Sequence, residues 1–152
     1  ALKGTKIKVV FVGGPDPQST DYYKQCVTEA DDNFTFLGWL ENGSPEIQSA
    51  YMNAHAVILP SCKEIFGNSL IEAGAAGAKL IATKSLPLDS MGIADYCRPI
   101  DPNSEKDIRE KVLAVMSEPK EEGQIQYIAS LFSWDAVAMR HLEIYRKVYD
   151  GE

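Results

Sequence analysis

The sequence lacks the features that define several protein classes. Its three cysteines, Cys26, Cys62 and Cys97, form no CxxC pair, so neither a disulfide framework nor a zinc site is expected. No apolar run approaches the roughly 20 residues that cross a bilayer, and no signal peptide is expected. The net charge of −7 argues against a nucleic-acid-binding surface. The 152 residues are therefore expected to form one cytoplasmic globular domain with a sizeable core.

Short apolar runs alternate with amphipathic segments along the whole chain. Runs rich in β-branched and aromatic residues predict strands at 7–12, 33–38, 56–59, 79–83 and 97–100. Apolar periodicity and capping residues predict helices at 21–30, 44–53, 70–76, 89–94, 106–117, 121–132 and 134–149. Pro99 cannot donate in a ladder, which places the last strand at an edge. The alternation predicts a three-layer, Rossmann-like parallel sheet with helices on both faces.

The stretch 56–83 carries the clearest functional signal. An apolar run ends at Pro60, a polar loop follows, and Gly67-Asn68-Ser69 leads into a helix of small residues that Gly77 ends. Ligands of parallel α/β sheets bind beyond the carboxyl ends of the strands, where this loop lies. The free amides at the start of such a helix favour an anion by about 0.3–1 kcal/mol.

Two carboxylates flank this corner. Glu64 precedes the helix and Glu72 lies about one turn inside it. A carboxylate repels phosphate, but it accepts hydrogen bonds from sugar hydroxyls that are worth about 1.5–3 kcal/mol each. The pattern therefore predicts a ligand with a phosphate in the middle and hydroxyl-rich groups at both ends, which describes a nucleotide sugar.

The residues Pro60-Ser61, Glu64, Phe66-Gly67 and Glu72-Ala73 resemble the donor-site signature of retaining GT-B glycosyltransferases of the group 1 type. The resemblance implies that this chain is the C-terminal, donor-binding half of a GT-B fold without its first strand. It implies that Glu64 is the catalytic candidate and binds the donor-sugar hydroxyls, and that Glu72 binds the ribose. It also implies that a stretch of backbone faces the sugar and the diphosphate, namely Phe66, Gly67, Asn68, Ser69 and Leu70.

The first third of the chain adds weaker donor-site candidates. Gly13 follows the first strand, where a glycine serves either a tight turn or a close approach to a ligand. The segment 36–38 resembles the family segment whose following loop lies near the nucleotide base. Gly38 and Trp39 are therefore further candidates, and Trp39 either stacks on the base or packs at the domain edge. The family's Gly-Gly turn after the fourth strand is absent, and 84–89 stands in its place.

The resemblance also implies domains and partners. Residues 1–132 are expected to form the nucleotide-sugar-binding domain of a fragment, and 133–152 a C-terminal helix that packs back on it. A glycan, lipid or small-molecule acceptor would be held by a missing N-terminal domain, with no cofactor and no metal. Contact with a membrane surface is expected only for the full-length protein. The alternatives are a GT-B-fold epimerase or phosphorylase and a flavodoxin-like binding module.

The family's opening strand, with the Arg and Lys that neutralise the donor diphosphate, is not found in this sequence. Because an acidic chain without those cations balances a diphosphate poorly, we expect the isolated polypeptide to be inactive and to bind nucleotide sugars only weakly. A calorimetric titration that reaches millimolar ligand tests this expectation. A sub-micromolar dissociation constant would contradict it.

Overall fold

The computed structural model describes residues 1–151 and divides into two compact units, Ala1–Ala50 and Tyr51–Glu152. In both units the paired strands run parallel. The strands form one sheet of two strands and one sheet of three. The predicted parallel α/β class is thus confirmed, and each unit is described by itself below.

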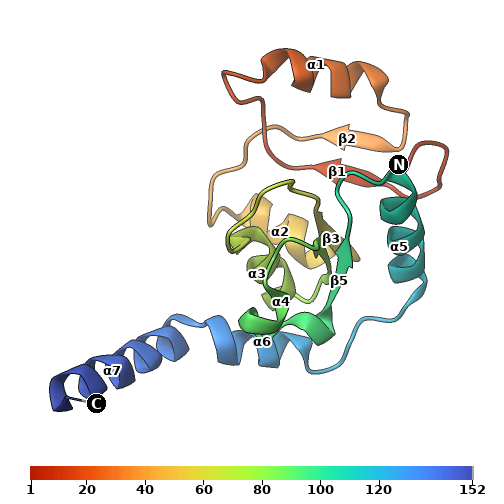
Figure 1. Ribbon diagram of the computed structural model, residues 1–152. Helices are drawn as coiled ribbons and strands as arrows, with labels where there is room; N and C mark the ends of the chain where they lie inside the picture. Colours follow the sequence, from red (N-terminus) through yellow and green to blue (C-terminus); the bar gives the residue numbers. More distant parts are fainter. Residues whose placement is uncertain (152) are drawn as a thin grey trace. The chain divides into compact units, whose positions relative to one another are not determined.

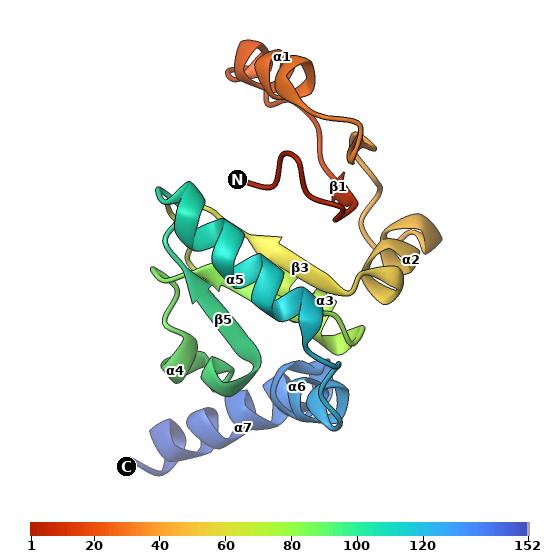
Figure 2. The same cartoon turned by 90° about the vertical axis from the view of Figure 1, so that its right-hand side faces the viewer.

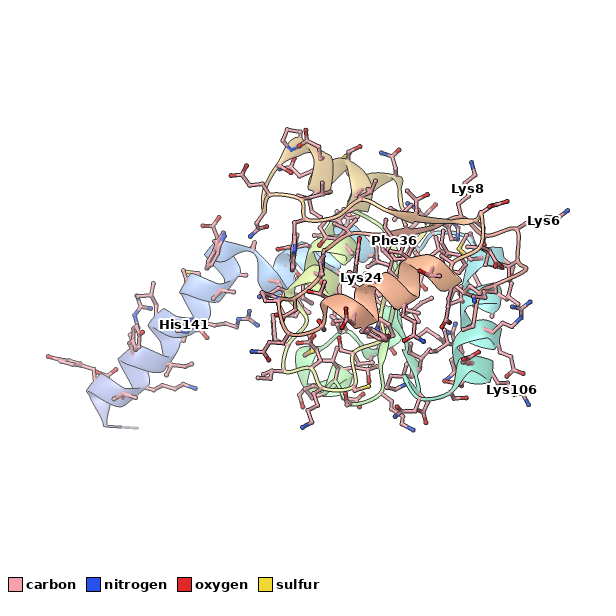
Figure 3. The ribbon with its side chains drawn as sticks, turned by 90° about the horizontal axis from the view of Figure 1, so that it is seen from above. Lys6, Lys8, Lys24, Phe36, Lys106 and His141 are labelled. Carbon is pink, nitrogen blue, oxygen red and sulfur yellow. The ribbon has the colours of Figure 1, made fainter. Side chains whose placement is uncertain are left out.

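The first unit is a strand–helix–strand arrangement. It contains β1 (Val9–Phe11), α1 (Thr20–Glu29), β2 (Phe34–Phe36) and the first part of α2 (Pro45–Asn53). Figure 1 shows α1 over one face of the strand pair, and the Tyr23 ring meets Phe36 edge-on with centroids 5.8 Å apart. Phe36, labelled in Figure 3, also stacks on Phe11 at 4.7 Å. Aromatic contacts therefore fix α1 on its sheet.

The second unit holds the larger sheet, in the order β3-β4-β5. Its elements are β3 (Ala56–Leu59), α3 (Asn68–Ala75), β4 (Lys79–Thr83), α4 (Leu88–Met91), the 3₁₀ turn η1 (Ala94–Tyr96), β5 (Cys97–Ile100), α5 (Glu105–Ser117), α6 (Gln124–Phe132) and α7 (Trp134–Asp150). Figures 1 and 2 show α3 and α5 on opposite faces of this sheet. The central strand β4 is buried throughout, whereas β5, which contains Pro99, forms an edge as predicted.

Small residues let α3 pack closely against its neighbours. A Cβ atom built on Gly74 would lie 2.4 Å from Ile128 Cδ1 of α6 and 3.1 Å from Leu80 Cδ1 of β4. Gly77 adopts a left-handed φ of 83° and ends the helix, as the sequence predicts. The Ala78 N–H donates to Ala73 O at 3.0 Å, which satisfies a carbonyl at the end of the helix.

The same end of α3 is held by a buried side chain of α6. Gln124 is 3% exposed, and its Nε2 donates to Gly74 O at 3.2 Å and to Ala78 O at 2.8 Å. One amide group therefore joins the last turn of α3 to the segment that enters β4. This fixes the carboxyl end of the helix whose other end forms the predicted donor corner.

The last helix, α7, buries none of its residues. Ser133 caps its start by accepting a hydrogen bond from the Ala136 amide, and Arg140 donates to Leu131 O at the end of α6. Figure 3 shows the part of α7 that carries His141 projecting away from the sheet of its unit. Large apolar side chains are exposed along it, including Trp134 and Tyr149. Within residues 1–151, no helix combines the length and apolar character that crossing a membrane requires.

The role of Gln124 is tested by Gln124→Leu, which removes both hydrogen bonds while it keeps an uncharged side chain in place. We expect a loss of about 1–3 kcal/mol in the free energy of unfolding, because buried carbonyls lose a donor. Urea denaturation measures this loss. Gln126→Leu makes the same change at an exposed position of the same helix and is expected to alter stability by no more than about 0.5 kcal/mol. Equal effects of the two substitutions would contradict the assignment.

Candidate donor-binding corner

The turn from β3 into α3 depends on a glycine with a left-handed backbone. Gly67 is the N-cap of α3, with φ 74° and ψ 59°, a conformation that other residues adopt at a cost of about 1–2 kcal/mol. A Cβ atom at this position would lie 3.0 Å from Leu59 Cδ2 and 3.5 Å from Leu86 Cδ1. Glycine is therefore required both by the backbone turn and by the packing of the corner on the end of β3.

The start of α3 presents backbone amides. The N-cap residue is Gly67, and the helix has no side-chain cap hydrogen bond. Asn68 and Ser69 are the first two residues of α3 and supply its first amides. The Gly67 carbonyl accepts hydrogen bonds from the Leu70 and Ile71 amides, which begin the regular helix. An uncapped N-terminus of this kind is suited to an anionic group.

The phenylalanine of the corner is held by α6. The Phe66 ring meets Phe132 edge-on, with centroids 5.7 Å apart. Phe66 remains 41% exposed, so the contact covers only part of its ring. The side chain is thereby fixed on the last residue of α6, and the backbone from Phe66 to Gly67 is held at the start of α3.

The two glutamates differ in how they are held. Glu64 is half-buried, and its Oε1 accepts a hydrogen bond from the Ile65 amide at 3.0 Å. Glu72 is exposed, and its Oε2 accepts a hydrogen bond from the Tyr51 hydroxyl at 3.1 Å. Burial and this hydrogen bond raise the pKa of Tyr51 to about 12, so its hydroxyl is a donor at neutral pH. Each of these bonds uses one oxygen of a carboxylate that has about four acceptor positions.

Polar contacts join the loops that follow the three strands of this sheet. The Lys84 ammonium, after β4, lies 2.7 Å from Asp101 Oδ2, after β5. This pairing lowers the pKa of Asp101 and raises that of Lys84. Cys62, after β3, is exposed, and its Sγ lies 4.0 Å from Asn103 Oδ1. Among residues 1–151, no group of three or more His, Cys, Asp or Glu side chains is arranged to hold a metal ion.

The remaining candidates lie together in the first unit. The Gly13 amide donates to Gly38 O at 2.8 Å, and both glycines have positive φ. The Trp39 ring packs on the backbone of Gly14, where an added Cβ would lie 2.4 Å from Trp39 Cδ1. Trp39 is nevertheless 74% exposed. The structure thus groups the predicted residues into two sets, one in each unit.

Sequence reasoning missed three residues that support the corner. Tyr51 holds Glu72, Phe132 holds Phe66, and Leu86 packs beside Gly67. Leu86 belongs to the segment that replaces the family's Gly-Gly turn, so this departure lies against the corner itself. No local signal marks these residues, because each contacts a partner at least 19 positions away in the chain.

Comparison with known proteins gives the family. The model of the family described as glycosyl transferases group 1 matches residues 1–118. Among solved structures, sucrose-phosphate synthase from Thermosynechococcus elongatus is similar to this chain, with a TM-score of 0.75 and 22% sequence identity. The likeness covers 95% of this chain and 39% of that one, so this chain spans well under half of that protein. No relative was found among curated protein sequences.

At 22% identity this likeness concerns the fold alone, and it confirms the predicted GT-B class. The family match concerns the sequence, and it extends over most of the 152 residues. The matched residues include the strands β1 to β5, the corner at Gly67 and α3, which carries Glu72. The chain belongs to the group 1 glycosyltransferases.

Proposed function

We propose that this chain is the donor-binding part of a retaining glycosyltransferase that moves a sugar from a nucleotide-diphosphate sugar to an acceptor. The observation that carries the proposal is the corner at the start of α3. There, a glycine with φ 74° precedes the first helical amides, and no side-chain cap accepts a hydrogen bond from them. Glu64 precedes these amides and Glu72 follows them on the same helix. Membership of a glycosyltransferase family supports the reaction class.

Glu64 is proposed to bind hydroxyl groups of the donor sugar. Its Oε1 is oriented by the Ile65 amide at 3.0 Å, which limits the freedom of the carboxylate before a ligand arrives. A carboxylate held in this way accepts hydrogen bonds from two neighbouring hydroxyls at moderate entropic cost. In this scheme Glu64 positions the sugar and forms no covalent bond with it.

The amides of Asn68 and Ser69 are proposed to bind the diphosphate. They act where negative charge develops as the bond from the sugar to the phosphate breaks. Preorganised donors at this point stabilise the leaving group more than the bound substrate, which is the requirement for faster transfer. Gly67 sets their direction through its left-handed backbone.

Glu72 is proposed to bind the ribose of the nucleotide. In the first unit, Gly13, Gly38 and Trp39 are proposed as further donor-binding residues. The acceptor is a glycan, a lipid or a small molecule. The acceptor is proposed to bind in the N-terminal domain that the family resemblance implies for a full-length protein.

The role of Glu64 is tested by Glu64→Gln in the full-length enzyme. We expect transfer to fall by at least about tenfold, because a neutral amide replaces charge-assisted hydrogen bonds worth about 1.5–3 kcal/mol each. Initial rates with a nucleotide-sugar donor measure the loss, and circular dichroism checks that the fold is intact. Glu122→Gln makes the same change at an exposed residue in the connection between α5 and α6 and is expected to leave the rate unchanged. Full activity of Glu64→Gln would remove Glu64 from the site.

A further inference from the structure

The tyrosine that contacts Glu72 sits on a firmly anchored segment. Tyr51 lies in the last turn of α2, and its ring packs against the core of the second unit. The two residues after this turn, Ala54 and His55, contact α5 and the segment that follows it. Lys120 Nζ donates to Ala54 O at 3.1 Å, and the His55 ring nitrogen Nε2 lies 3.3 Å from Val115 O of α5. The Tyr51 hydroxyl is therefore held in a defined place.

The side chain of Glu72, by contrast, is exposed and is not held by packing. It is exposed on α3, between the buried residues Ile71 and Ala73. The backbone at this position is fixed by the packing of α3, but an exposed glutamate side chain keeps considerable rotamer freedom, and this freedom is lost when it binds a ligand. The hydrogen bond from Tyr51 to Oε2 at 3.1 Å removes part of that freedom in advance.

We propose that Tyr51 is a positioning residue that orients the Glu72 carboxylate for the ribose hydroxyls of a nucleotide donor, an inference that rests on the function proposed above. The tyrosine donates its one proton to Oε2. The carboxylate keeps acceptor capacity on Oε1 and on the second lone pair of Oε2. Ribose hydroxyls can donate hydrogen bonds, so they match the acceptor positions of Glu72 that Tyr51 leaves open.

The protonation state of the Tyr51 hydroxyl agrees with this role. Burial first, and then the hydrogen bond to Glu72, raise the pKa of Tyr51 to about 12. The hydroxyl thus keeps its proton over the whole range in which an enzyme of this kind works. The carboxylate therefore always meets a donor and never a second negative charge.

The test compares ribose and dideoxyribose nucleotides on the full-length protein. Calorimetric titration gives the affinities of ADP, GDP and UDP and of their 2′,3′-dideoxy counterparts. Tyr51→Phe removes only the hydroxyl and keeps the ring in the core. We expect it to weaken binding of the preferred ribonucleotide by about three- to tenfold and to leave the affinity of the dideoxy counterpart within twofold.

Two further variants complete the experiment. Glu72→Ala removes the oriented group, so the double variant with Tyr51→Phe is expected to bind the ribonucleotide no more weakly than Glu72→Ala alone. Tyr96→Phe is the matched control, because Tyr96 is half-buried in the same unit, in the 3₁₀ turn before β5, and its ring lies 4.9 Å from that of Tyr127, centroid to centroid. Loss of the Tyr96 hydroxyl is expected to change the affinity of neither the ribonucleotide nor its dideoxy counterpart.

The outcomes separate the inference from the function on which it rests. An equal loss for ribose and dideoxyribose nucleotides would show that Tyr51 only supports the fold and would overturn the inference. Unchanged ribonucleotide affinity, or additive losses in the double variant, would overturn it as well. If the unaltered protein binds none of the three nucleotides, the proposed function fails and the inference fails with it.

Discussion

The site depends on the contact between Gly67 and the end of β3. The left-handed turn at this glycine, eight residues after Leu59, leads the chain into α3, and the absence of a Cβ lets it lie against that leucine. Any other residue here would strain the backbone, and its Cβ would lie 3.0 Å from Leu59 Cδ2, so that the leucine side chain would have to shift. The start of α3 at Asn68 follows from this one turn.

The other end of α3 makes that geometry rigid. Gly74 meets Ile128 and Leu80 at a distance that leaves no room for a methyl group, and Gln124 holds the carbonyls of the last turn. A helix of eight residues has little stability of its own, so its position comes from these contacts. Packing far from the corner thus fixes the backbone at Glu72 relative to the amides at the start of the same helix.

Signals that lie within a few residues of each other were readable from the sequence. Gly77 predicted the end of α3, Pro99 predicted an edge strand, and the alternation of apolar runs predicted the parallel α/β class. A turn of the backbone before Asn68 could be expected from the sequence, because a glycine directly before a helix is typical of a turn. The contact that holds Glu72 could not be predicted from the sequence. Tyr51 and Glu72 are 21 positions apart and meet only after α2, β3 and α3 have packed.

The lysines of the second unit bear on how the proposed corner could balance the charge of a diphosphate. Of the lysines close to it in sequence, Lys79 is buried at the start of β4, with its Nζ 2.9 Å from Glu118 Oε2 and 4.0 Å from Glu121 Oε1. Lys84, beyond the end of the same strand, is paired with Asp101. Lys63 is exposed on the loop before Glu64, where solvent screens its charge.

A diphosphate carries several negative charges and the chain carries a net −7, so the helix amides alone leave most of the charge of a bound diphosphate uncompensated. Tight donor binding at this corner therefore requires cations beyond those that the second unit has paired with its own carboxylates.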